Sequence, residues 1–396
     1  MKHKDKLIYI CILALSVLFL FTGNWVASRD RYTPEREFEI IFHTGIVTDI
    51  LERTETDANF DWAFSDVDVN IAFNVRITDS QRRGDIVTAH QNISSFFMVN
   101  ESEVSVGDRV LLQYDDFNSI YNFATFVRIN YMVILGVVFL ALVILFGRKK
   151  GFSAIVALGF TCMAVFFVFI PAILSGRNIY VTTIVVCVFA IISTLLIVIG
   201  PNKKSLSAMI GCLGGVLLSG LLMLIMDAVL SLTGVLDAET LSLLHLPNPI
   251  DIRAIIFAGV ILGAVGAIMD VAMSISSSLW ELRESGGVCD FGGIVKSGIN
   301  IGKDILGTML NTLILAYIGS SLSLLLLINV HTTSLMELFS MEMIIVEFLR
   351  ALVGSFGMLL TIPLTAGVCG WLYASLADKD EETNFVDDYH ARLRNK

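Results

Sequence analysis

Long apolar segments alternate with short polar ones along most of the chain. A helix that spans a bilayer needs about 20 apolar residues, because the hydrocarbon core is about 30 Å thick. Eight segments meet or approach this length, at residues 7–26, 131–146, 152–174, 179–199, 206–229, 254–278, 305–330 and 351–374. The pattern predicts a membrane protein with an α-helical bundle of about eight transmembrane helices.

The segment between the first two apolar runs follows a different pattern. Every second residue is apolar over six positions, namely Val67, Val69, Ile71, Phe73, Val75 and Ile77. A period of two is typical of a β-strand that is buried on one face. Further strands are expected over 37–48, 85–90, 104–113 and 122–129. Five short strands in about a hundred residues predict a small β-barrel-like domain of the OB type.

These patterns divide the chain into four expected parts. Residues 1–26 form an N-terminal transmembrane anchor or signal segment, 27–130 an extracytoplasmic β domain, 131–376 a seven-helix transmembrane domain, and 377–396 a cytoplasmic tail. A basic start followed by an apolar run also fits a cleaved signal peptide, with Val26-Ala27-Ser28 as the cleavage site. The uncleaved anchor is the preferred interpretation, since the run is long enough to span the bilayer.

Composition and charge agree with a membrane location. Apolar residues make up 55% of the chain and charged residues 16%, and the mean hydropathy is +0.76. Soluble domains contain about 25% charged residues, so a soluble enzyme fold and a disordered chain are excluded. Residues 27–129 contain 18 acidic and 9 basic residues and carry −9 of the formal net charge of −10. This balance argues against a nucleic-acid partner, and the lipid bilayer is the first partner expected.

The lysines indicate an orientation. In an eight-span arrangement all eleven lysines lie on one side, in the two termini and in the loops at 147–151, 200–205 and 279–304. The positive-inside rule assigns that side to the cytoplasm. Both termini are therefore expected in the cytoplasm, and the N-terminus would lie outside only if the first segment is cleaved.

The sixth predicted span carries a stripe of small and polar residues. The stripe consists of Gly259, Gly263, Gly266, Asp270, Ser274, Ser277 and Glu281. Steps of three and four residues place them along one face of a helix. A carboxylate inside a bilayer costs several kcal/mol unless it is paired, protonated or hydrated, so Asp270 is a candidate functional residue. The alternative is a hydrogen bond to a neighbouring helix that only fixes packing.

The seventh predicted span offers polar residues for the same site. Asp304 and Asn311 share one side of that helix, and Asn311 lies at nearly the depth of Asp270 when each residue adds about 1.5 Å. We therefore expect Asp270, Ser274, Ser277 and Asn311 to converge on a polar pocket open to the cytoplasm, with Asp304 nearer the water boundary. Hydrogen bonds that only hold helices together are the structural alternative.

The last predicted span combines an ion pair with a proline. Glu347 and Arg350 are three residues apart and can pair at the outer boundary. Pro363 breaks the helix, because it removes one backbone donor and frees the carbonyl of Leu359. Such a break can hold an ion in a transporter, or it can be a packed kink. Small residues share a face in the fifth span (Gly211, Gly215 and Ser219) and in the last (Gly354, Gly357, Thr361 and Thr365).

No cofactor, metal site or catalytic residue is predicted. The sequence from Gly298 to Asp304 differs from a phosphate loop, because it is one residue short and has Asp304 where Ser or Thr would contact Mg²⁺. The six cysteines contain no CxxC pair. The histidines expected on the outer side are scattered, without metal-ligand spacing, at positions 43, 90, 245 and 331.

Two blocks of the chain resemble a known family. Residues 270–282 (DVAMSISSSLWEL) and 297–313 (SGINIGKDILGTMLNTL) are similar to the YibE/F-like family of bacterial multi-pass membrane proteins. The similarity continues through 314–319 and, more loosely, over most of the chain from the β domain on. This resemblance implies a bacterial plasma membrane. It implies no particular activity, and no catalytic residue is carried over from it.

Three functions are weighed on these residues. The first is a transporter or permease of an unidentified small solute or ion, which would use an ion gradient if transport is active. The second is a non-catalytic envelope or complex-assembly protein whose extracytoplasmic domain binds a protein or cell-wall partner. The third is an intramembrane enzyme with Asp270 and Asp304 as a carboxylate pair. This third function is disfavoured, because Asp304 lies roughly 10 Å shallower than a partner of Asp270 should.

Overall fold

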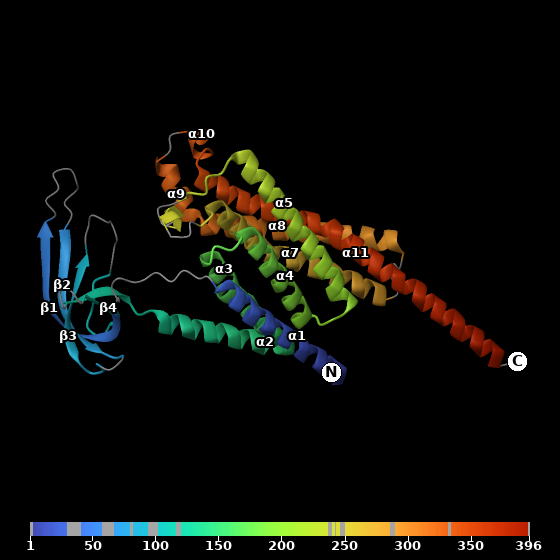
Figure 1. Cartoon of the computed structure of the whole chain (residues 1–396), viewed down its shortest axis with the longest axis horizontal. Coiled ribbons are helices and arrows are strands. Elements are labelled where there is room, and N and C mark those ends of the chain that lie inside the picture. The colour runs from blue at the N-terminus through green and yellow to red at the C-terminus, as the bar shows by residue number, and fades with distance from the viewer. Residues whose placement is uncertain are drawn as a thin grey trace. The chain divides into compact units, whose positions relative to one another are not determined.

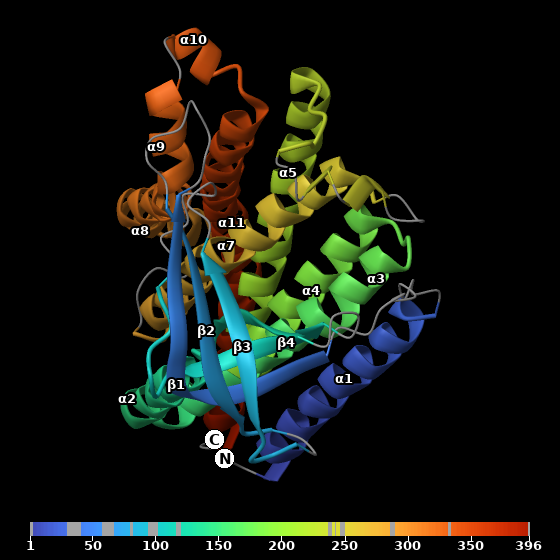
Figure 2. The ribbon, with the colours of Figure 1, turned by 90° about the vertical axis from the view of Figure 1, so that its left-hand side faces the viewer.

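The structure is a computed structural model of the 396-residue chain (Figures 1 and 2). It describes residues 3–29, 41–57, 67–79, 82–93, 102–115, 120–236, 240–241, 243–245, 250–285, 290–331 and 334–394. Two compact units are present, one of residues 34–142 and one of residues 1–33 with 143–396. The predicted limits at 1–26, 27–130, 131–376 and 377–396 stay predictions.

The smaller unit contains a closed barrel of five strands. These are β1 (Ile41–Asp57), β2 (Val67–Ile77), β3 (Ile86–Ile93), β4 (Arg109–Asp115) and β5 (Ile120–Phe126). The order around the barrel is β1-β2-β3-β5-β4, with β3 and β5 parallel and the other pairs antiparallel. The small β-barrel predicted from the alternating pattern is confirmed. Residues 37–40 of the first predicted strand lie outside the described residues.

The barrel core follows from the period of two. Four alternate residues of β2 are at most 2% exposed, namely Ile71, Phe73, Val75 and Ile77. Buried Gln91 of β3 fixes the segment before β4, because its Oε1 accepts the Val104 N–H at 3.0 Å and its Nε2 donates to the Ser102 carbonyl at 3.1 Å. The approach to β4 is thus bonded to the barrel wall.

The larger unit is helical. Its elements include α1 (His3–Ala27), the second half of α2 (Ile129–Ala164), a π-helical turn η2 (Val165–Phe169), α3 (Ile170–Leu174), α4 (Ile179–Val198), α5 (Lys203–Leu230), a 3-10 turn η3 (Leu243–His245), α7 (Ile252–Glu284), α8 (Phe291–Ser320), α9 (Leu322–His331), α10 (Leu335–Leu338) and α11 (Glu342–Arg394). Asn178, Asn202, Asp251 and Asp290 cap the N-termini of α4, α5, α7 and α8 through their side-chain oxygens.

Among the described residues, seven helical stretches are long and apolar enough to cross a membrane, rather than the eight predicted. The difference arises because the predicted spans at 131–146 and 152–174 lie in one helical stretch, Ile129–Leu174. That stretch is kinked at Arg148, whose φ of 47° and ψ of −125° are not helical. The two predicted spans therefore lie on the two sides of this kink, inside one helical stretch.

Helix α7 packs against four other helices of the bundle, namely α4, α5, α8 and α11. Figure 2 shows α7 between α4 (green) and α8 (orange), with α11 (red) beside it. The small-residue faces of α5 and α11 contact each other, since a Cβ placed at Gly211 or Gly215 would strike Thr365 or Thr361. The packing face predicted for the fifth span is therefore confirmed.

Pro363 lies inside α11, which continues on both sides of it. The predicted break is thus limited to the one backbone bond that a proline cannot donate. No separate pair of half-helices forms at this position.

Candidate functional site

The polar stripe on α7 runs through the middle of a candidate spanning helix. Asp270 is exposed within the isolated chain, and Ser274 and Ser277, one and two turns further on, are half-buried. The opposite face of the same turns is fully buried, at Ile268, Val271, Ala272 and Ile275. The helical spacing therefore places Asp270 and the two serines on one uncovered face of an otherwise enclosed helix.

The glycines of the stripe leave room beside their neighbours. A Cβ on Gly263 would lie 3.0 Å from the hydroxyl oxygen of Tyr317 on α8, and one on Gly259 would lie 3.9 Å from Nη2 of Arg350 on α11. A Cβ on Gly266 would meet no atom within 4 Å. The face is thus bordered by a hydroxyl and a guanidinium near its start and is open just before Asp270.

The far end of the stripe opens into a cavity of about 430 Å³. Its lining residues come from α7, the kinked middle of α2, the end of α4 and the start of α5, and include Lys150, Asn202, Lys204, Met273, Ser277, Trp280, Glu281 and Glu284. Trp280 Nε1 donates to Glu284 Oε1 at 2.8 Å. Two ammonium groups, two carboxylates and an indole in one cavity can hold a charged or zwitterionic small molecule.

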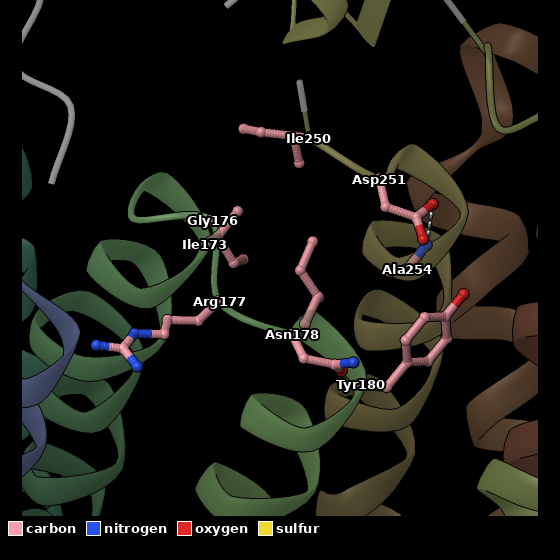
Figure 3. Close-up of a pocket in the computed structure, with 9 residues that line it drawn as sticks. Ile173, Gly176, Arg177, Asn178, Tyr180, Ile250, Asp251 and Ala254 are labelled. Carbon is pink, nitrogen blue, oxygen red and sulfur yellow. Dashed lines mark hydrogen bonds between the residues drawn. The ribbon is translucent and has the colours of Figure 1, made fainter. Parts of the chain in front are cut away.

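A second cavity, of about 240 Å³, lies where α4 and α7 begin (Figure 3). Asp251 accepts the Ala254 N–H at 3.3 Å, and Asn178 accepts the Val181 N–H at 3.1 Å, so both polar side chains cap helices. The guanidinium of Arg177 points away from Asp251, and its Nη2 donates to the Val26 carbonyl at 3.3 Å (Figure 3).

The two cavities lie at opposite ends of the α4–α7 pair, because one is lined by the first residues of both helices and the other by the last. The 20 residues of α4 span about 30 Å, which is the thickness of the hydrocarbon core. Between the cavities the seam is apolar and closed. The rings of Tyr180 and Phe257 lie 5.0 Å apart, and Val186 and Ala258 are buried.

Sequence reasoning missed a buried hydroxyl cluster next to the larger cavity. Ser276 Oγ lies 2.7 Å from Ser207 Oγ, and the Tyr373 hydroxyl lies 2.9 Å from each. Ser276 also donates to the Lys204 carbonyl at 2.7 Å. Ser276 follows Ser274 by two residues, which turns it by about 200° from the stripe toward the core. This helical rotation could have been used on the sequence to predict that Ser276 faces away from Ser274.

The predicted partners on α8 are exposed and form no hydrogen bond to Asp270 among the described residues. Asp304 and Asn311 are exposed, whereas the apolar residues between and beside them pack on the core, at Ile305, Leu306, Met309, Leu310 and Leu313. Within the described ranges no hydrogen bond joins Asp270 to Asn311 or to Asp304. The structure therefore groups Asp270 with Ser274 and Ser277 along α7, while the convergence of the two α8 residues on them stays a prediction.

Glu347 and Arg350 form an ion pair on α11. Arg350 Nη1 donates to Glu347 Oε1 at 2.7 Å, and both side chains are largely buried. The second carboxylate oxygen, Oε2, is buried and has no hydrogen-bond partner among the described residues. Because Arg350 also lies beside Gly259, this pair borders the start of the α7 stripe.

The described part of the chain holds no group of three or more His, Cys, Asp or Glu side chains placed to bind a metal ion. Cys187, Cys212 and Cys369 are buried and Cys11 and Cys162 are exposed. Cys289 lies outside the described residues.

The seven apolar helices and the barrel define the class as a multi-pass membrane protein with a small β domain. The family model described as YibE/F-like protein matches residues 135–375, which is more than half of the chain. The chain therefore belongs to the YibE/F-like family, as the resemblance of its two sequence blocks predicted. No curated protein and no solved structure matches it.

Proposed function

We propose that this protein is a transporter or permease of a small solute or ion. The observation that carries the proposal is the position of Asp270, midway along the enclosed helix α7 and on a polar stripe that ends in a charged cavity. A carboxylate at such depth is costly in a bilayer unless water, a proton or a cation reaches it. A stripe of hydroxyls leading from the charged cavity would supply that access.

The arrangement suggests a closed state with one open vestibule. The larger cavity brings a solute to Ser277, and Ser274 leads on to Asp270, whose carboxylate would accept a cation or a proton. Passage to the smaller cavity requires the Tyr180–Phe257 contact to separate. Movement of α4 against α7 would open the seam on one side and close the vestibule on the other.

The proposal includes an orientation. Lys150 and Lys204 line the larger cavity, and the positive-inside rule places lysine-rich ends in the cytoplasm. If the kinked stretch Ile129–Leu174 crosses the membrane twice, once on each side of Arg148, the vestibule and both termini would face the cytoplasm of a bacterial cell, and the barrel would lie outside its plasma membrane.

The test is an untargeted comparison of small solutes and metal ions inside and outside cells. Four strains are compared at matched expression: wild type, a deletion, and the deletion with either Asp270→Asn or Asp290→Asn. Asp290 caps α8 through its side chain, and asparagine caps equally well, so this variant controls for loss of one carboxylate without loss of the fold.

We expect one solute to shift across the membrane in the deletion and in the Asp270→Asn strain, by roughly tenfold or more in rate if that carboxylate is removed from the path. The Asp290→Asn strain should match wild type. Restoration of the wild-type pattern by Asp270→Asn would contradict the proposal.

A second candidate is an assembly protein that binds a protein or cell-wall partner through an OB-type barrel. The barrel has a hydrophobic core of its own, which favours this candidate. Deletion of residues 27–129 would then abolish function while Asp270→Asn preserved it. The transporter proposal predicts instead that Asp270→Asn alone impairs function.

A further inference from the structure

The barrel unit has a cavity of about 430 Å³ at the point where the chain enters α2. It is lined by Thr44, Gly45, Ile46, Thr78, Arg83, Arg109, Val127, Ile129 and Asn130. Its only charged lining residues are the two arginines, which come from the turn before β3 and from the first residue of β4. The lining contains no carboxylate.

The two arginines are available to a ligand. Neither Arg83 nor Arg109 takes part in an ion pair among the described residues. Asp79, which lies next to the lining residue Thr78, is already engaged, because its Oδ2 accepts the Thr44 N–H at 2.9 Å and its Oδ1 lies 3.5 Å from His43 Nδ1. A guanidinium presents several N–H groups in a plane that matches two oxygens of a phosphate.

The cavity lies at the level of a membrane surface. Ile129 and Asn130 begin the apolar stretch of α2, and side chains from there to Phe146 are mostly exposed and apolar. A helix of that kind starts at the boundary between headgroups and hydrocarbon. The cavity wall formed by Val127, Ile129 and Asn130 is therefore at headgroup depth.

The turns that carry the arginines also have the character of a membrane-contacting edge. Ile86, three residues after Arg83, is 60% exposed, and Val106, three residues before Arg109, is 64% exposed. Apolar side chains beside arginines are typical of segments that insert shallowly among lipid headgroups. Acidic residues of the barrel farther than about 8 Å from the arginines are screened at physiological salt, and of the nearer ones Asp108 is engaged, because its Oδ2 accepts the Ser105 N–H at 2.8 Å.

We propose that this cavity binds a phosphate group, and that the phosphate belongs to the headgroup of a membrane lipid. Arg83 and Arg109 hold the phosphate oxygens, and Ile86, Val106 and Ile129 contact the upper acyl chains. The bound lipid fixes the barrel against the membrane at the start of α2.

The test is native mass spectrometry of the full-length protein in detergent. The protein is titrated with dioleoylphosphatidylglycerol, with dioleoylglycerol, which has the same chains and no phosphate, and with glycerol 3-phosphate as competitor. Arg83→Gln and Arg109→Gln are compared with Arg76→Gln, an exposed arginine of β2 that does not line the cavity. Arg83→Lys keeps the charge, and melting temperatures show whether each variant is folded.

We expect phosphatidylglycerol to bind wild type in preference to dioleoylglycerol. Each glutamine variant should bind about fivefold more weakly, which is the usual contribution of one basic residue near an anionic lipid surface. Arg76→Gln should match wild type, and Arg83→Lys should fall between. Equal binding by wild type and both cavity variants, or an equal loss in Arg76→Gln, would overturn the site. Competition by glycerol 3-phosphate at the concentration of the lipid would overturn the lipid as the source of the phosphate.

Discussion

The helices α7 and α8 are consecutive in the sequence and both carry an aspartate and further polar residues, yet they occupy opposite environments. In the most apolar 18-residue window of each, 56% of α7 is buried and only 6% of α8. The helix α7 contacts four other helices, and Asp270, Ser274 and Ser277 lie on the face that these helices leave uncovered, whereas Ser276 is buried against Ser207. The helix α8 packs with one apolar side, and its polar residues point outward. Polar residues in a membrane helix therefore suggest a pathway only when the rest of that helix is enclosed.

The largest effect should come from filling the close contact between α5 and α11. A leucine at Gly215 would collide with Thr361 and Gly357, so Gly215→Leu should cost about 3 kcal/mol or more and leave little folded protein. By contrast, Gly266→Leu on the α7 stripe and Gly307→Leu on α8 meet no atom within 4 Å at Cβ and should both fold. Melting temperatures in detergent measure this.

The same variants sharpen the comparison of α7 with α8. Gly266→Leu puts a large apolar group one turn from Asp270 and should slow transport, whereas Gly307→Leu should not. Equal transport by the two folded variants would contradict the assignment of the path to α7.

The next effect concerns the buried hydroxyl cluster. Ser276→Ala on α7 leaves the Lys204 carbonyl and the Tyr373 hydroxyl each with one partner fewer, and should reduce the free energy of unfolding by about 1 kcal/mol. Thr308→Ala on α8 removes only a hydroxyl that bonds within its own helix at an exposed position, and should change it by less than about 0.5 kcal/mol. A larger loss from Thr308→Ala would mean that α8 is covered by another helix.

The smallest effect is expected for a solvent-exposed ion pair of the barrel. In the barrel, Arg53 donates to both carboxylate oxygens of Glu103, at 2.8 Å and 2.9 Å. These hydrogen bonds lower the pKa of Glu103 below its ordinary value. Arg53→Gln should raise that pKa back toward the ordinary value of a glutamate, which carboxyl NMR shifts of the full chain would report.

The sign of the associated stability follows from that direction. Because the folded-state pKa of Glu103 is lowered, the pair stabilises the barrel above the unfolded-state pKa and loses its contribution as the pH falls through the folded-state value. The melting temperatures of wild type and Arg53→Gln should therefore converge in acid. Divergence in acid would contradict the pair.

Features within one element were predictable from the sequence. The alternation from Val67 to Ile77 predicted a buried strand face, and the spacing from Gly259 to Glu281 predicted a single helical stripe, because each depends only on the geometry of its own element. The contact between the α5 and α11 faces was predictable in kind, since small residues at every fourth position allow close approach. The number and length of the strands predicted a closed or half-open barrel, and the structure shows the closed form.

Features that depend on the rotation of one helix against another were not predictable in the same way. Asn311 was expected to face Asp270 because both lie at one depth, but Asn311 is exposed, and the neighbouring Met309 and Leu310 are the residues that pack on the core. The cluster of Ser276 with Ser207 and Tyr373 joins three spans that lie far apart in the sequence. The count of helical stretches is seven because the predicted spans at 131–146 and 152–174 are joined across the kink at Arg148.

The most direct test of the account is whether water reaches the α7 stripe. Ser274→Cys and Asn311→Cys are made in a chain whose six native cysteines are replaced, and a charged thiol reagent that does not cross membranes is added to vesicles of both orientations. The account predicts that the cysteine at 274 reacts from one side and that the cysteine at 311 does not react. Reaction at 311 with none at 274 would contradict it.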